Sequence, residues 1–270
     1  MRCPFRSSAV SAAAVALVLA ATLPGAAPAG AAVLAGHRAV YALTLDTAKS
    51  ADVVAAKGTM HYEVQDACDG WATNQRLEMT ITNRDGQNVQ MVSDYVTWES
   101  RDGHRFRFHM KQTTDEAVTS QTDGEATTGP NGGEVHYTLP AETVVKLPPG
   151  TLLPMAHTAA IIDAAEAGKR FIGLPLFDGT SEKGGQDTFI TVVDTKPAGA
   201  EGKGWPDLLK LPSVDVHVAF FDRKPDAMMP DYEAGMRYWV NGVGDHMRMD
   251  FGTFVMDGLM TEFHLLPKRC

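Results

Sequence analysis

Cysteine is scarce in this chain of 270 residues, which contains three, and Cys3 lies before an apolar run at the N-terminus. No two cysteines have the C-x-x-C spacing of many redox and zinc sites. The G-x-S-x-G, P-loop and H-E-x-x-H signatures are also missing, so the enzyme classes that depend on them are excluded. We therefore expect a protein that is not an enzyme and that has no metal site and no cofactor.

Basic residues are outnumbered. The sequence has 24 Lys and Arg against 33 Asp and Glu. Two of the basic residues, Arg2 and Arg6, lie in the first 31 residues, which contain no acid, so the remainder has 22 basic against 33 acidic residues and a net charge of −11. A negative surface argues against nucleic acid and anionic lipid headgroups as electrostatically attracted partners.

Long apolar runs are absent beyond the N-terminus, so the sequence predicts no transmembrane segment in the mature chain. Residues 9–23 form an uncharged apolar stretch behind the two arginines. The stretches 27–29 (A-P-A) and 29–31 (A-G-A) offer the small residues that signal peptidases recognise. We interpret 1–31 as a secretory signal peptide that is removed, which predicts export to a compartment where disulfides persist.

Short alternating segments separated by turn residues fill most of the rest, and they predict a mainly β protein. In the stretch 71–82, Trp71, Thr73, Gln75, Leu77, Met79 and Ile81 share one face. Asp-Gly pairs mark the turns. We expect a single domain over 32–270, and the regular turn signals between short strands predict a barrel, a sandwich or a strongly bent antiparallel sheet.

One helix is predicted near 154–167, where alanines dominate, Pro154 suits the first turn and Gly168 suits the end. The segment 148–170 forms a waist between two sets of strands, and a helix of such small side chains packs close against a sheet. We expect Met155, Ala159 and Ile162 to form the buried face of this helix.

An apolar groove beside the helix is a candidate binding site, because a helix of small side chains cannot fill a wide space. The residues assigned to it are Phe106, Phe108, Met110, Met155, Ala159 and Ile162. Ordinary core packing is the default interpretation of Phe106, Phe108 and Met110, and the groove is the alternative to it.

The titratable residues give weak signals. His104 and His109 lie five apart on a predicted strand and therefore face opposite sides, which makes a poor metal pair. His157 and Asp163 lie on different faces of the helix, so a structural hydrogen bond is the better interpretation of His157. The stretch 178–182 resembles half of a calcium loop, but it lacks the alternating acids and distal Glu, and a turn is expected.

Cys68 and Cys270 are the cysteines that remain after removal of the signal peptide, and an exported chain favours a disulfide between them. Such a bond would close a loop of 203 residues, and the chain-entropy model gives at most about 5 kcal/mol of stabilisation for that length. Unpaired thiols and an intermolecular bridge are the alternatives.

An ordered set of motifs resembles the envelope integrity protein B (EipB) family of alphaproteobacteria. The set consists of the signal peptide, Cys68, P-G-T-L-L-P-M-A-H-T at 149–158, P-L-F-D-G at 175–179, D-F-G-T-F-V-M-D-G at 250–258 and the terminal Cys270. The resemblance implies a periplasmic β-spiral, which is a long, strongly bent antiparallel sheet that resembles an open barrel and wraps around one central helix. It also implies a disulfide bond between the two cysteines, a role in envelope integrity and a protein partner of the tetratricopeptide-repeat type.

Three functional classes follow. The first is a non-catalytic envelope protein that acts through protein contacts, and we favour it on the sequence. The second is a periplasmic carrier or sensor that binds an apolar ligand, such as a lipid or a lipoprotein acyl chain, beside the helix. The third is a hydrolase with an unrecognised site, which a cleft with several perturbed titratable groups would support.

Overall fold

The computed structural model describes residues 32–224 and 228–269, so the predicted signal peptide, 1–31, lies outside the described residues. The described chain forms strands β1 (His37–Ala48), β2 (Val53–Asp66), β3 (Gly70–Asn83), β4 (Asn88–Ser100), β5 (Arg105–Thr114), β6 (Ala117–Thr127), β7 (Gly133–Leu139) and β8 (Thr143–Leu147), helix α1 (Pro154–Glu166), and strands β9 (Phe171–Leu176), β10 (Gln186–Lys196), β11 (Ser213–Asp222), β12 (Tyr232–Trp239), β13 (Gly244–Asp250) and β14 (Phe254–Leu265).

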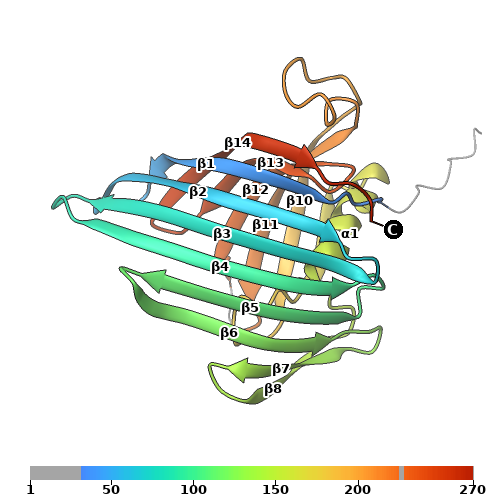
Figure 1. Ribbon diagram of the computed structural model, residues 1–270, viewed down its shortest axis with the longest axis horizontal. Coiled ribbons are helices and arrows are strands. Elements are labelled where there is room, and N and C mark those ends of the chain that lie inside the picture. The colour runs from blue at the N-terminus through green and yellow to red at the C-terminus, as the bar shows by residue number, and fades with distance from the viewer. Residues whose placement is uncertain (1–31, 225–227, 270) are drawn as a thin grey trace, which may run out of the picture.

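All these strands belong to one antiparallel sheet with the order β8-β7-β6-β5-β4-β3-β2-β1-β14-β13-β12-β11-β10-β9. The two edge strands, β8 and β9, are neighbours in sequence, and α1 connects them. The sheet curls so that β10–β13 lie behind β1–β4, with α1 at one end of the space between them (Figure 1). The predicted fold class, a bent and open antiparallel sheet around one helix, is therefore confirmed.

Alternation along each strand decides which side chains face the interior. On β3, the odd-numbered side chains from Trp71 to Met79 are buried or half-buried, whereas Asn74, Arg76 and Glu78 are exposed. This is the face division that the sequence predicts. Because burial of a large apolar side chain contributes about 1.5–3 kcal/mol, the alternation fixes the register of every long strand.

β1 lies at the centre of the sheet and brings the two ends of the described chain together. Its first residue, His37, is opposite Val64 of β2 on one side and Leu265 of β14 on the other. Two arms extend from this centre, one through β2–β8 and the other from β14 to β9. The arms approach each other again where Leu152 donates its N–H to Pro175 O at 2.9 Å and accepts from Phe177 N at 2.9 Å.

The buried side of α1 differs from the expected one. Ile162 is fully buried as predicted, but Met155 and Ala159 are half-buried, and the buried row runs through His157, Ile161 and Ala165. The expectation that Met155 and Ala159 are buried was wrong, because the row through His157 faces the interior in their place. The His157 imidazole finds a buried hydrogen-bond partner, so the helix turns that row inward. Within the described residues, no helix has the length and hydrophobicity that a membrane crossing requires.

Candidate functional site

An internal space of about 440 Å³, called the interior chamber here, lies between the first half of α1 and the inward faces of both arms. Three elements of the fold line it. Met110 and Tyr95 come from the arm β2–β8, Met236 and Val218 come from the arm β9–β14, and Met155 and Ile161 come from the helix. A small lobe of about 150 Å³ shares Tyr62, Met155 and Met236 with it. The volume falls within the range of about 300–1,000 Å³ that is usual for small-molecule sites.

The walls of the chamber combine flexible apolar side chains with neutral hydroxyl groups. Methionines from β5, α1 and β12 adapt readily to ligands of irregular shape. Burial raises the pKa of Tyr62, Tyr95 and Tyr238, so each phenol stays protonated. The Tyr95 hydroxyl donates to the carbonyl of Asp178. The lining therefore suits an apolar chain with a few polar contacts rather than a free ion.

Glu99 sets the position of the helix beside the chamber. Its side chain on β4 is buried, with Oε2 accepting from Met155 N at 2.7 Å and Oε1 from Ala156 N at 2.9 Å. Burial raises the pKa of this carboxyl to about 7, against the opposing effect of the two backbone N–H donors. These contacts satisfy N–H groups that every helix start leaves without partners.

The sequence interpretation missed Glu99, although a signal for it exists. The N-cap residue, Leu153, has no side-chain oxygen, so no local side chain accepts from the first helical N–H groups. A distant acceptor is then required. Nothing local to residue 99 identifies which inward-facing acid of the sheet meets the helix.

His157 and Asp178 are held by structural hydrogen bonds. Thr188 Oγ1 donates to Leu174 O at 2.7 Å, so His157 Nε2, 2.8 Å from the same oxygen, must be the donor in that pair. Burial lowers the pKa of His157 to about 4, and the ring is neutral. Asp178 accepts from Thr180 N at 3.0 Å and from Gln186 Nε2 at 3.0 Å, while burial raises its pKa. The stretch at Asp178 is therefore a turn, as expected.

The buried residues with shifted pKa values do not form a catalytic group. Glu99, His157 and Asp178 each bond to different partners, and none of the three bonds to another. Nucleophilic or general-base catalysis requires a nucleophile and a base within about 2.6–3.2 Å of each other. Among the described residues, no group of three or more His, Cys, Asp or Glu is arranged to hold a metal ion.

The six residues assigned to a groove divide among three places. Met110 and Met155 line the interior chamber. Ile162 is completely buried, and Ala159 is half-buried and is not part of the chamber lining. Phe106 and Phe108 are 1% and 3% exposed and belong to a separate core cluster.

That core cluster is aromatic. The Phe108 ring lies 5.4 Å from Phe177 and 5.6 Å from Tyr137, both edge-on. It also packs on Gly179, where an added Cβ would lie 2.5 Å from Phe108 Cγ. Gly179 has a φ of +74°, so a glycine suits this position for both reasons. Phe106 and Phe108 therefore pack inside this cluster and do not line the chamber.

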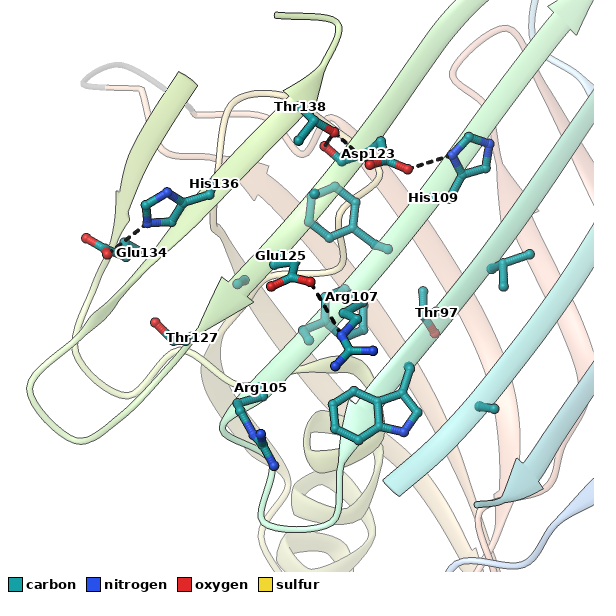
Figure 2. Close-up of a pocket in the computed structure, with 17 residues that line it drawn as sticks. Thr97, Arg105, Arg107, His109, Asp123, Glu125, Thr127, Glu134, His136 and Thr138 are labelled. Atoms are coloured by element: carbon teal, nitrogen blue, oxygen red, sulfur yellow. Dashed lines mark hydrogen bonds and ion pairs between the residues drawn. The ribbon is translucent and has the colours of Figure 1, made fainter. Parts of the chain in front are cut away.

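A second hollow, the outer groove, lies on the opposite face of β3–β7 and has a volume of about 1,030 Å³. Figure 2 shows its polar side chains projecting from neighbouring strands. They pair with one another: His109 Nδ1 lies 2.9 Å from Asp123 Oδ2, and Arg107 Nε lies 3.5 Å from Glu125 Oε1. Arg107 also lies over the Trp98 ring at 5.0 Å. The outer groove is thus an exposed surface on which several polar side chains pair with one another, and the chamber is the stronger candidate site.

Cys68 lies at the turn between β2 and β3, with a φ of 68° and its N–H donating to Asp66 Oδ1 at 3.0 Å. Its predicted partner, Cys270, lies outside the described residues, so their disulfide stays a prediction. The end of the chain does approach this turn. Lys268 is close enough to contribute to the lowered pKa of Asp66, behind the larger effects of the Cys68 N–H and Arg101.

A curled, open antiparallel sheet that encloses a chamber and a helix defines a β-barrel-like protein. A family model described as EipB-like matches residues 28–267, and the chain belongs to this family. A curated relative from Brucella abortus (strain 2308), the cell envelope integrity protein EipB, is 34% identical over 259 residues, which cover 89% of this chain and 88% of the relative.

A solved structure agrees with this assignment. The crystal structure of a beta-barrel-like protein from Brucella abortus, described as a domain of unknown function, superimposes with a TM-score of 0.79 at 29% identity. The match covers 88% of this chain and 100% of that chain. The family resemblance drawn from the motifs is confirmed.

Proposed function

We propose that this protein supports the integrity of the cell envelope from the periplasm, and that it does so without catalysis by holding an apolar chain, such as a lipid acyl chain, in the interior chamber. The name of the Brucella relative supports the envelope role. The signal-peptide pattern of 1–31 supports export. The observation that carries the binding role is the chamber itself, with methionines from three separate elements around it.

The chamber favours a bound chain over a reaction for a physical reason. The carboxylate and the imidazole that line it, Asp178 and His157, are held by Thr180 and Thr188, and no hydrogen bond joins one to the other. A methionine-rich lining adapts to many apolar shapes, which suits carriage more than selective chemistry.

The direct test is to fill the chamber. Met110→Trp and Met155→Trp add bulk without charge, and we expect each to weaken binding of dansyl-labelled undecanoic acid at least about tenfold, or 1.4 kcal/mol. Val96→Trp is the matched control, because Val96 is 47% exposed on the outer face of β4. Unchanged binding in both chamber variants would contradict the proposal.

Native mass spectrometry of protein purified from its own periplasm gives the complementary result. We expect a retained lipid mass that is reduced in Met155→Trp and kept in Val96→Trp. Protein that carries no apolar molecule and binds no labelled fatty acid would rule out the chamber as a lipid site.

A second candidate function is contact with a protein partner, and one surface feature favours it. Phe171 on β9 and Phe189 on β10 are 66% and 48% exposed, and their rings stack with centroids 6.1 Å apart. Val193, 56% exposed, is also on β10. Exposed apolar groups that cluster in this way mark interaction surfaces. The tetratricopeptide-repeat partner implied by the family resemblance is assigned to this surface as part of the proposal.

Complementation of a deletion strain tests this second function. The double variant Phe171→Glu with Phe189→Glu should fail to restore the envelope while it still binds the labelled fatty acid. Val118→Glu, at a site 54% exposed on β6, is the control for an added surface charge. Full complementation by the double variant would exclude a partner at this surface.

A further inference from the structure

We propose that the peptide bond between Ala31 and Ala32 is the processing site of this protein, and that the new amino group of Ala32 binds Asp163 on the central helix. This inference rests on the export part of the proposed function. Hydrolysis adds one water across the bond, so that Ala31 keeps a carboxylate and Ala32 gains an amine that is protonated at neutral pH. A periplasmic-side peptidase with a preference for small residues supplies the reaction, and A-G-A at 29–31 meets that preference.

The contact that receives the amine is already formed. Ala32 N donates to Asp163 Oδ1 at 2.7 Å, across a sequence separation of 131 residues. Such a length is typical of hydrogen bonds to an ionised carboxylate, from a peptide N–H as at Glu99 or from an ammonium group. Cleavage of the bond before Ala32 therefore places a positive charge where the geometry suits one.

Asp163 is otherwise in an unfavourable position. It lies in the last turn of α1, where the helix dipole disfavours acids, and no basic residue is present in that turn. Within the described residues, the Ala32 N–H is the one hydrogen bond made by its carboxylate, and it forms no ion pair with a side chain. A cation at Ala32 would neutralise this carboxylate, and processing is what produces one.

The segment after Ala32 is held along the small lobe of the chamber. Ala35 N donates to Asn241 O at 2.8 Å, and Leu34 packs so closely on Gly242 that an added Cβ would lie 2.6 Å from Leu34 Cδ2. Leu34, Ala35 and His37 all line the small lobe. Attachment of Ala32 to Asp163 thus ties one wall of the lobe to the helix that forms another wall.

The first measurement is the N-terminal residue of the protein exported with its own signal peptide, read from intact mass and N-terminal sequencing. We expect Ala32. A chain that begins at Gly30 or elsewhere overturns the inference and leaves export intact. A chain that keeps residues 1–31 overturns both the inference and the export proposal.

The second measurement is the pKa of the Ala32 amine in the processed protein, from the pH dependence of its acylation rate. An adjacent carboxylate favours the ammonium form, so the pKa should exceed the range of about 7.7–8.0 for a free α-amine. Asp163→Asn should return it to that range, and Glu166→Gln, which removes an exposed acid from the same turn, should not. A free-amine pKa in the unmodified protein overturns the inference even if Asp163→Asn does not fold.

The third measurement is thermal. Asp163→Asn should lower the melting temperature of the processed chain by about 2–4 °C, since 1 kcal/mol corresponds to a shift of that size in a domain of this length. A chain extended by Gly-Ala before Ala32 should lose most of this difference, because its ammonium lies two residues away. Because the amine pKa is raised in the folded protein, the stabilisation is fully present below the pKa of the unfolded chain and is lost above the pKa of the folded chain. The difference in melting temperature should therefore also vanish at alkaline pH. The processed chain and the extended chain are each measured with and without Asp163→Asn. Equal melting temperatures of these four proteins overturn the inference.

Discussion

The inner and outer faces of β5 have opposite properties. Phe106, Phe108 and Met110 point inward and are at most 6% exposed, whereas Arg105, Arg107 and Lys111 on the other face are exposed. The inner face builds a core cluster and one wall of the chamber. The outer face builds a groove more than twice as large, yet several of its polar side chains pair with one another. Hollow volume alone is therefore a poor guide to function here.

The same comparison applies to titratable groups. Buried Glu99 and His157 have strongly shifted pKa values because they are removed from water and each has a fixed partner. Glu134, on the outer side, has a pKa lowered to about 2 by Lys146 and His136, but its side chain is 36% exposed to solvent. Screening by water weakens such exposed pairs. Substitutions on the inner face should thus have much larger effects than matched substitutions on the outer face.

The largest expected effect is in the aromatic cluster. Phe108→Ala should lower the free energy of unfolding by about 4 kcal/mol, since truncation of a buried phenylalanine leaves a cavity. Phe189→Ala, at a ring 48% exposed, should change it by less than about 0.5 kcal/mol. Urea unfolding of the two variants measures the difference. Similar midpoints would show that the Phe108 ring is not part of the core.

Removal of Glu99 should be the next largest effect. Glu99→Ala leaves the N–H groups of Met155 and Ala156 without their acceptor, and we expect a loss of about 3 kcal/mol. Glu125→Ala, on the outer face, should be within about 0.5 kcal/mol of the unmodified protein. Chemical denaturation at neutral pH is the measurement. A loss as small as that of Glu125→Ala would show that the start of α1 does not depend on Glu99.

His157 predicts a smaller, pH-dependent effect. Its pKa is lowered to about 4 in the folded protein, so below pH 6.5 the unfolded chain binds a proton that the folded chain does not. Stability is therefore lost as the pH falls from 6.5 towards 4, by about 2 kcal/mol at pH 5 for this group. In His157→Gln, the free energy of unfolding should differ between pH 7 and pH 5 by about 2 kcal/mol less than in the unmodified protein. An identical pH dependence in both proteins would contradict the buried, neutral histidine.

The smallest effect is expected on the outer groove. Arg107→Ala removes an exposed pair with Glu125 at 3.5 Å and should change the free energy of unfolding by about 0.5 kcal/mol or less. The same variant should bind the labelled fatty acid normally. If it loses more than about 1 kcal/mol, or loses binding, the outer groove matters more than its paired and exposed charges indicate.

Local patterns accounted for much of the fold. The period of two identified the inward face of β3, and the alanine-rich stretch with its proline and glycine identified α1 almost to the residue. Met110 and Met155 were also assigned to a binding space and do line the chamber. The assignment of Phe106 and Phe108 to the same space depended on whether the arm ends were filled, and Phe177, Tyr137 and Leu153 fill them from distant parts of the chain.

The sequence by itself determined the strands, the turns, the helix and which side of each strand faces inward, because these depend on backbone preferences and on burial repeated over a few residues. Only the tertiary structure decided that β1 pairs with both β2 and β14, that Glu99 meets the start of α1, and that Ala32 reaches Asp163. Each of these contacts joins residues that are far apart in the chain, with a geometry set by how strongly the sheet curls. That curl arises from the packing of the whole interior around α1, which no short segment encodes.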